Sequence, residues 1–214
     1  MNLILQLFNH NKKTNQTLVL FTMYCLTLSL FRAKLTHSIY LFFLIWNLFL
    51  AGIPYIITSY LKLKLENKLL NSKSYLILVS WLLFLPNSFY IITDLVHIVR
   101  TDGRLFWLDM ILVSSYSVLG FVVGIKSIYQ FEMLIKQNKK SSFIIPIVCF
   151  LCGTGIYLGR ILRFNSWDVI GNPIKLIVGI LNQLITTEGI QFSILFGSFI
   201  YIIYLLKKSN YENL

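Results

Sequence analysis

The sequence carries little charge for its length. Only 13% of the 214 residues are Asp, Glu, Lys or Arg, whereas 57% are hydrophobic. A soluble domain covers its surface with charged side chains on about a quarter of its residues, so this composition excludes a water-soluble fold. Long apolar runs recur along the chain, and about 20 apolar residues are enough to cross a bilayer as a helix. The sequence therefore predicts an integral membrane protein in contact with the lipid bilayer.

Acidic residues are especially scarce, because eight Asp and Glu stand against 19 Lys and Arg, which gives a net charge of +11. In a soluble domain such an excess would favour a nucleic-acid partner. Here most lysines fall in short connections between the apolar runs, where positive charge orients spans and contacts anionic headgroups. No basic stripe interleaved with aromatic residues lies outside the runs, so we expect no nucleic-acid partner.

The motifs of common membrane enzymes are also missing. The chain has no H-E-x-x-H, no G-x-S-x-G and no G-K-[ST], the signatures of zinc proteases, serine hydrolases and phosphate-binding loops. Cys149 and Cys152 have the C-x-x-C spacing of redox and metal motifs, but no second ligand pair flanks them. We interpret both as small apolar residues on a buried helix. The residues indicate no metal site and leave any cofactor unknown.

Six apolar runs qualify as membrane-spanning helices. Their approximate bounds are Thr17–Phe31, Ile39–Leu61, Tyr75–Ile92, Leu105–Ile125, Phe143–Leu162 and Ile190–Leu206. A seventh run, Ile174–Ile185, is too short to span and is expected to form an interfacial or re-entrant helix. The first run follows Lys12 and Lys13 as in a signal peptide, but no small-residue cleavage site follows it, so we expect a retained span. The predicted fold is an all-α polytopic transmembrane helix bundle of about six spans, forming a single domain over residues 1–214.

The distribution of Lys and Arg between the connections predicts the orientation of the bundle. Twelve lysines fall on one side of the predicted membrane, and seven Lys and Arg fall on the other. The cytoplasmic side carries the excess of positive charge. We therefore expect a multi-pass protein of the cell membrane with both termini in the cytoplasm. All four aspartates, and all the arginines except Arg32, then gather around two loops on the outer side.

A polar stripe lies at the end of the third predicted span. Asn87, Tyr90, Asp94 and His97 fall within about 80° of one another if the segment is an α-helix. Pro86 removes a backbone donor just before the stripe and is expected to kink the helix. Unpaired polar groups in hydrocarbon cost several kcal/mol, so the stripe must face protein, water or headgroups. It is either a substrate or ion site, with Asp94 and His97 as the catalytic acid–base pair and Asn87 and Tyr90 as binding residues, or interhelical hydrogen bonding.

A second polar cluster follows the fifth predicted span. Arg160 and Arg163 lie one helical turn apart, a spacing that suits one shared anion or pairing with carboxylates. Asn165, Trp167 and Asp168 come directly afterwards, and a tryptophan there suits the membrane interface. Alternatively, the arginines only extend their charged ends toward the headgroups. These five residues are candidate binding residues for an anionic lipid or a small anionic ligand.

Asp109 lies about four residues inside the fourth predicted span, which is about 6 Å below its end. An ionised aspartate at that depth costs on the order of 2–3 kcal/mol unless it is paired. We expect an arginine of the Arg160 and Arg163 cluster to be its partner, and Asp109 joins the binding candidates. The two polar motifs should then meet, with Asp94 or Asp109 in salt-bridge range of Arg160 or Arg163.

Two G-x-x-x-G pairs occur within the predicted spans. They are Gly120 with Gly124 and Gly155 with Gly159. Small residues at this spacing let helix backbones approach closely in a membrane. We therefore interpret these glycines as helix-packing positions.

The two polar motifs together resemble a known family. The first reads Trp81…Phe84-Leu85-Pro86-Asn87-x-x-Tyr90-x-x-Thr93-Asp94-x-x-His97, and the second reads Gly155-x-Tyr157-Leu158-Gly159-Arg160-x-x-Arg163-x-Asn165-Ser166-Trp167-Asp168. They resemble a family of bacterial predicted membrane proteins catalogued as domain of unknown function 1361. The resemblance extends from about the second span to the last. It implies a multi-span bacterial membrane protein without an established activity.

Two classes of function stay open from the sequence. In the first, the outward-facing Asp/His/Arg site binds or processes an anionic lipid, a cell-envelope precursor or a small solute. In the second, the protein is a non-catalytic assembly or accessory subunit, and the Asp/Arg cluster is structural. An open pocket beside the polar residues would favour the first, and a fully paired cluster without a cavity would favour the second. The sequence predicts neither enzymatic activity nor oligomeric state.

Overall fold

The computed structural model describes residues 3–65, 70–100, 103, 105–135, 141–164 and 168–212. These residues form helices joined by short turns, and no strand occurs among them. The helices are α1 (Leu3–His10), α2 (Lys12–Thr36), η1 (Tyr40–Phe42), α3 (Phe43–Leu65), α4 (Ser72–Tyr90), η2 (Ile91–Arg100), α5 (Phe106–Ile135), α6 (Ser141–Arg160), α7 (Asp168–Gly171), α8 (Pro173–Ile185) and α9 (Thr187–Glu212), where η denotes a 3-10 helix.

Within the described residues, six helical segments are long and apolar enough to cross a membrane. They are Lys12–Thr36, Tyr40–Leu65, Ser72–Ile98, Phe106–Ile135, Phe143–Arg160 and Thr187–Ser209. The all-α multi-span fold is therefore confirmed, and the short seventh run forms α8. The approximate bounds differ from the observed ones by several residues, and the largest difference is in α5. This helix continues ten residues past Ile125, so Lys126 lies inside a helix rather than in a connection.

Local signals in the sequence set several helix ends. The side-chain oxygen of Asn71 accepts a hydrogen bond from the Ser74 backbone N–H at 2.9 Å, which caps the start of α4. Pro173 lies in the first turn of α8. Backbone N–H groups there have no acceptor within the helix, so the missing N–H of proline costs no hydrogen bond. His37 ends α2 in the left-handed conformation, with φ of 50°.

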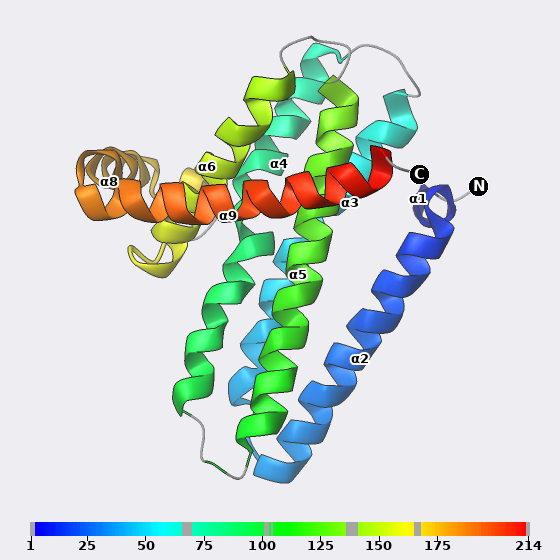
Figure 1. The fold of residues 1–214 in the computed structure, drawn as a ribbon, viewed down its shortest axis with the longest axis vertical. Helices are drawn as coiled ribbons and strands as arrows, with labels where there is room; N and C mark the ends of the chain where they lie inside the picture. The colour runs from blue at the N-terminus through cyan, green and yellow to red at the C-terminus, as the bar shows by residue number, and fades with distance from the viewer. Residues whose placement is uncertain are drawn as a thin grey trace.

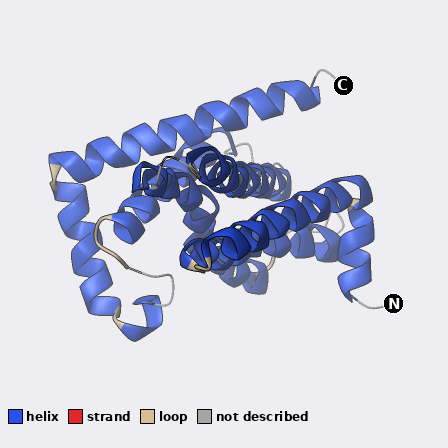
Figure 2. Cartoon of the chain, turned by 90° about the horizontal axis from the view of Figure 1, so that it is seen from below, coloured by secondary structure: helices blue, strands red, loops and turns tan. Residues whose placement is uncertain are grey.

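The helices do not all run in the same direction. Figure 1 shows α2, α3 and α5 extending along the long axis, whereas α9 crosses this direction over its whole length. Figure 2, viewed along the long axis, shows the same crosswise path of α9. The contact between α9 and α6 is close, because a Cβ on Gly197 would lie 2.9 Å from the Phe150 Cα. Glycine at this crossing therefore lets the two backbones approach directly.

The two G-x-x-x-G pairs pack against one segment of α4. A Cβ on Gly120 would lie 2.7 Å from the Ser88 carbonyl oxygen, and one on Gly124 would lie 2.8 Å from the Ser88 Cβ. On the other side of α4, Gly155 faces the ring of Pro86. Gly159 faces the ring of Tyr90, and a Cβ on Gly159 would lie 3.3 Å from that ring. The predicted packing role of these glycines is confirmed, and α4 lies between α5 and α6 as a result.

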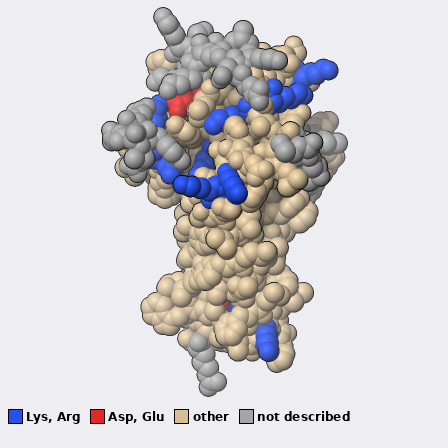
Figure 3. All heavy atoms as spheres, turned by 90° about the vertical axis from the view of Figure 1, so that its right-hand side faces the viewer, with Lys and Arg blue, Asp and Glu red and all other residues tan. Residues whose placement is uncertain are grey.

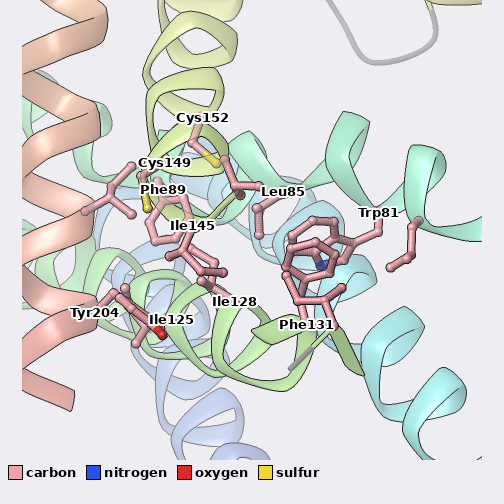
Figure 4. Packing of buried hydrophobic residues seen from close by; sticks show 14 of the residues in the cluster. Trp81, Leu85, Phe89, Ile125, Ile128, Phe131, Ile145, Cys149, Cys152 and Tyr204 are labelled. Carbon is pink, nitrogen blue, oxygen red and sulfur yellow. The ribbon is translucent and has the colours of Figure 1, made fainter. Parts of the chain in front are cut away.

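The larger hydrophobic core lies where α4, α5, α6 and α9 meet (Figure 4). Trp81 stacks on Phe131 with ring centroids 4.3 Å apart, and the Trp81 indole N–H donates to the Ser127 hydroxyl at 2.7 Å. Cys149 and Cys152 are fully buried in the same core, as the sequence analysis expected. The core therefore fixes α4, α5, α6 and α9 relative to one another.

Charged side chains are unevenly distributed over the surface. On the face drawn in Figure 3, Lys and Arg gather toward one end of the molecule. A broad band of other residues separates them from a smaller basic patch near the other end. A band without charged side chains between two charged ends is typical of the surface that a bilayer contacts.

Candidate functional site

The polar stripe of the third span lies at a change of helix type. α4 ends at Tyr90 and the chain continues as the 3-10 helix η2. A 3-10 helix has three residues per turn, so Asp94 and His97 lie directly one above the other. The α-helical spacing assumed for this stripe was therefore wrong beyond Tyr90. The His97 Nε2 lies 3.9 Å from the Asp94 Oδ1.

Asp94 is the centre of a paired cluster. The Arg160 guanidinium donates to its Oδ1 at 3.0 Å, and the Asn47 amide donates to its Oδ2 at 2.9 Å. Arg160 also donates to the Thr93 carbonyl oxygen and lies over the ring of Tyr90, 5.4 Å from its centroid. Asp94 is only 1% exposed. The expected meeting of the two polar motifs is thus confirmed through Asp94 and Arg160.

Asn47 was missed by the sequence analysis. It is a polar residue inside the apolar run of the second span, and that isolation was the only available signal. In the structure Asn47 donates from α3 to the Asp94 carboxylate. The residues of the cluster therefore come from α3, η2 and α6.

His97 has a second partner that the sequence also did not indicate. Its Nδ1 lies 3.1 Å from the Tyr40 hydroxyl, and its ring packs edge-on against Tyr40 and Phe43. About a fifth of the His97 side chain is exposed. The imidazole is therefore held between Tyr40 on one side and the Asp94 carboxylate on the other, with one surface open.

Asp109 does not belong to this cluster. Its carboxylate accepts two hydrogen bonds from Arg32 of α2, from Nε at 2.9 Å and from Nη2 at 3.2 Å. The expectation that Arg160 or Arg163 would be its partner was wrong. In the structure α2 packs against α5, and this contact brings Arg32 to Asp109.

Arg163 lies just beyond α6 in an unusual backbone conformation. Its φ is 60°, in the left-handed region, and the Phe164 N–H donates to the Leu158 carbonyl oxygen at 3.0 Å. This bond folds the chain back over the end of α6, and glycine is the residue that most often takes the left-handed position after a helix. The Arg163 side chain is exposed, and within the described residues it has no hydrogen bond or ion pair.

A cavity of about 760 Å³ lies beside the cluster. Its polar lining comes from six of the residues already discussed, namely Asn47, Asn87, Tyr90, His97, Arg160 and Arg163, together with Thr154. Its apolar walls include Leu82 and Leu83 of α4, Leu151 and Leu158 of α6, and Leu176 and Ile180 of α8. The cavity is therefore cationic and polar at one end and apolar along its length.

The remaining predicted residues are placed as follows. The Asn87 side chain donates to the Phe84 carbonyl oxygen at 3.0 Å and lines the cavity. Asp168 begins α7 and is not among the described residues that line the cavity. Asn165 and Trp167 lie outside the described residues. In the described part of the chain, no group of three or more His, Cys, Asp or Glu side chains is placed to hold a metal ion.

Six candidate spans and a polar cluster recessed among them define a multi-pass α-helical membrane protein. Residues 46–203 match the model of a family described as protein of unknown function (DUF1361), and the chain belongs to this family. No curated protein and no solved structure matches the chain. All the residues that line the cavity fall within the matched range, whereas Arg32 and Tyr40 lie before it.

Proposed function

We propose that the protein binds an amphipathic anion, a lipid or envelope precursor with an anionic headgroup, in the cavity beside Asp94 and Arg160. The observation that carries this proposal is the polarity of the cavity, with two arginines at one end and leucine-rich walls along the rest. Arginine side chains bind phosphate and carboxylate groups through charge-assisted hydrogen bonds. The apolar walls suit an acyl or isoprenoid chain, because burying apolar surface there removes it from water.

The size and opening of the cavity support a ligand taken from the bilayer. Leu151 and Arg160 both line it and are nine residues apart in α6, which corresponds to about 13 Å along the helix. Trp46 and Leu83, also in the lining, are 53% and 40% exposed. The cavity therefore opens through an apolar surface of the bundle, the side that faces lipid.

The two arginines have different roles in this proposal. Arg160 is held by Asp94, and its positive charge is compensated there. Arg163 has no carboxylate partner among the described residues, so it supplies the uncompensated positive charge that an anion requires. His97, oriented by Tyr40 and 3.9 Å from Asp94, is the candidate acid–base group if the headgroup is chemically processed.

The alternative of a purely structural cluster also has an observation in its favour. Both oxygens of Asp94 are hydrogen-bonded and the residue is buried, as in an interhelical tie. This alternative accounts for Asp94 and Arg160. It does not account for the cavity beside them, or for Arg163, which forms no hydrogen bond or ion pair with the described residues.

The backbone of Arg163 offers a test that separates binding from folding. A residue other than glycine in the left-handed conformation costs about 1–2 kcal/mol, and glycine itself loses about 0.5–1 kcal/mol more backbone entropy on folding. Arg163→Gly should therefore leave the free energy of unfolding unchanged or raise it by up to about 1.5 kcal/mol. It also removes the cation, and since a hydrogen bond to a charged group contributes about 1.5–3 kcal/mol, anion affinity should fall roughly tenfold or more.

The measurement is lipid binding to the purified protein in nanodiscs, followed by native mass spectrometry. Phosphatidylglycerol, phosphatidylcholine with the same chains, and inorganic phosphate are compared, so that a lipid headgroup is distinguished from a free anion. His37→Gly is the matched control for the backbone, because His37 also has a positive φ but lies at the end of α2. Lys34→Ala is the matched control for charge. Equal phosphatidylglycerol affinity in wild type and Arg163→Gly would refute the proposed binding site.

A further inference from the structure

The polar end of the cavity beside Asp94 offers a small net charge. Among the described residues that line it, Arg160 and Arg163 are charged and His97 is titratable. Asp94 lies directly behind this lining and is 1% exposed. Its Oδ1 is 3.0 Å from the Arg160 Nη1 and 3.9 Å from the His97 Nε2. With His97 neutral, these side chains together carry one positive charge.

Arg160 is compensated in charge but keeps hydrogen-bond donors for a ligand. A guanidinium has five N–H groups. The Arg160 Nη1 donates to the Asp94 carboxylate and the Tyr90 hydroxyl, and the Nη2 donates to the Thr93 carbonyl oxygen. Its Nε–H and one Nη2–H have no partner among the described residues, and 21% of the side chain is exposed. Arg160 can therefore hydrogen-bond a headgroup while Asp94 cancels its charge.

The balance between attraction and desolvation depends on the charge of the ligand. The cost of moving an ion from water into a medium of low dielectric rises with the square of its charge. Its attraction to the site rises only in proportion to its charge. A single negative charge is neutralised by the net charge of this site, whereas a double charge leaves one negative charge uncompensated beside the leucine walls. A zwitterionic headgroup would bring a further cation toward Arg163.

We infer that the cavity selects a headgroup with one negative charge, a phosphodiester rather than a phosphomonoester, and that Asp94 determines this selectivity. The inference rests on the proposed function, since it concerns the ligand of the same cavity. Asp94 acts by cancelling one of two arginines. Its replacement by a neutral residue would double the net charge of the site and favour a dianion.

The test uses nanodiscs that contain equal amounts of phosphatidylglycerol and phosphatidic acid with the same chains, and native mass spectrometry counts the retained lipids. At pH 8.5 histidine side chains are neutral. The monoester of phosphatidic acid is doubly charged there, because its second ionisation lies near pH 6. The wild type should retain more phosphatidylglycerol than phosphatidic acid.

Asp94→Asn keeps an oxygen that can accept from the Asn47 amide but removes the negative charge. A unit charge about 12 Å from a ligand, at an effective dielectric of about 20, changes affinity roughly tenfold for each charge on the ligand. The ratio of retained phosphatidic acid to phosphatidylglycerol should therefore rise roughly tenfold. A purely structural role of Asp94 would lower the binding of both lipids without changing this ratio.

A second variant changes the charge without breaking the ion pair. Val96 lines the cavity next to His97 and is 53% exposed, so Val96→Lys adds a cation that the fold can accommodate. It should raise the same ratio in the same direction. Ile161→Lys is the matched control, because Ile161 is also 53% exposed, follows the end of α6 and is not among the lining residues.

The outcomes separate this inference from the proposed function. A wild type that retains neither anionic lipid better than phosphatidylcholine would refute the proposed function and the inference with it. A wild type that binds phosphatidylglycerol but retains phosphatidic acid equally well would overturn only the inference. The same follows if Val96→Lys leaves the ratio unchanged, or if Ile161→Lys shifts it equally.

Discussion

The ion pair between Arg32 and Asp109 should dominate the stability of the contact between α2 and α5. Both side chains are buried, at 7% and 1% exposure, and two hydrogen bonds join them. The Arg32 Nη1 is buried and has no hydrogen-bond partner among the described residues. Removing the carboxylate would therefore leave a guanidinium buried with none of its three nitrogens paired to a charge.

The expected change in the free energy of unfolding depends on whether one member of the ion pair or both members are replaced. Asp109→Val or Arg32→Met alone should lower the free energy of unfolding by about 3–5 kcal/mol, because one buried charge remains uncompensated. The double variant should be close to wild type or more stable, since neither charge is left in the apolar interior. The coupling between the two positions should thus be several kcal/mol.

The test is to measure membrane yield and reversible unfolding in detergent for the wild type, the two single variants and the double variant. Lys34→Met is the control, because Lys34 is an exposed cation two residues after Arg32 on the same helix and its loss should change stability by at most about 0.5 kcal/mol. The reasoning fails if both single variants have wild-type stability. It fails equally if the double variant is as unstable as the singles, since the cost would then come from lost packing.

Two further predictions concern orientation and chemistry. In a background without the native cysteines, Lys73→Cys and Lys34→Cys should be labelled from opposite sides of the membrane, with Lys73 cytoplasmic; labelling from the same side would contradict the predicted topology. His97→Ala should keep membrane yield and thermal stability near wild type, because His97 is partly exposed, but should abolish any turnover that depends on proton transfer. Full complementation of a gene deletion by His97→Ala would remove the acid–base role.

The parts of the site predicted correctly from the sequence share one physical cause. An aspartate in an apolar run is costly unless it is paired, and this cost depends only on local sequence. Asp94 was therefore recognised as needing a partner, and Arg160 as a cation at the matching depth; their contact follows from that need. The same reasoning required a partner for Asp109, and the structure contains one.

The identity of the partner is a different question. Arg32 and the two arginines at the end of α6, Arg160 and Arg163, offer the same charge near the same predicted side, and nothing in the local sequence distinguishes them. Which arginine reaches Asp109 depends on which helix packs beside α5. Asn47 and Tyr40 were missed for the same reason, since a single polar residue in an apolar run shows a need for contacts but not their direction.

The sequence by itself determined the class of protein, the six apolar segments and the short α8, because transfer of side chains into lipid depends on composition over about 20 residues. Only the tertiary structure decided the crosswise path of α9 and the cavity beside Asp94. A helix has the same hydropathy whatever its direction. Its direction is set by contacts such as that of Gly197 with α6, which arise only when distant segments meet.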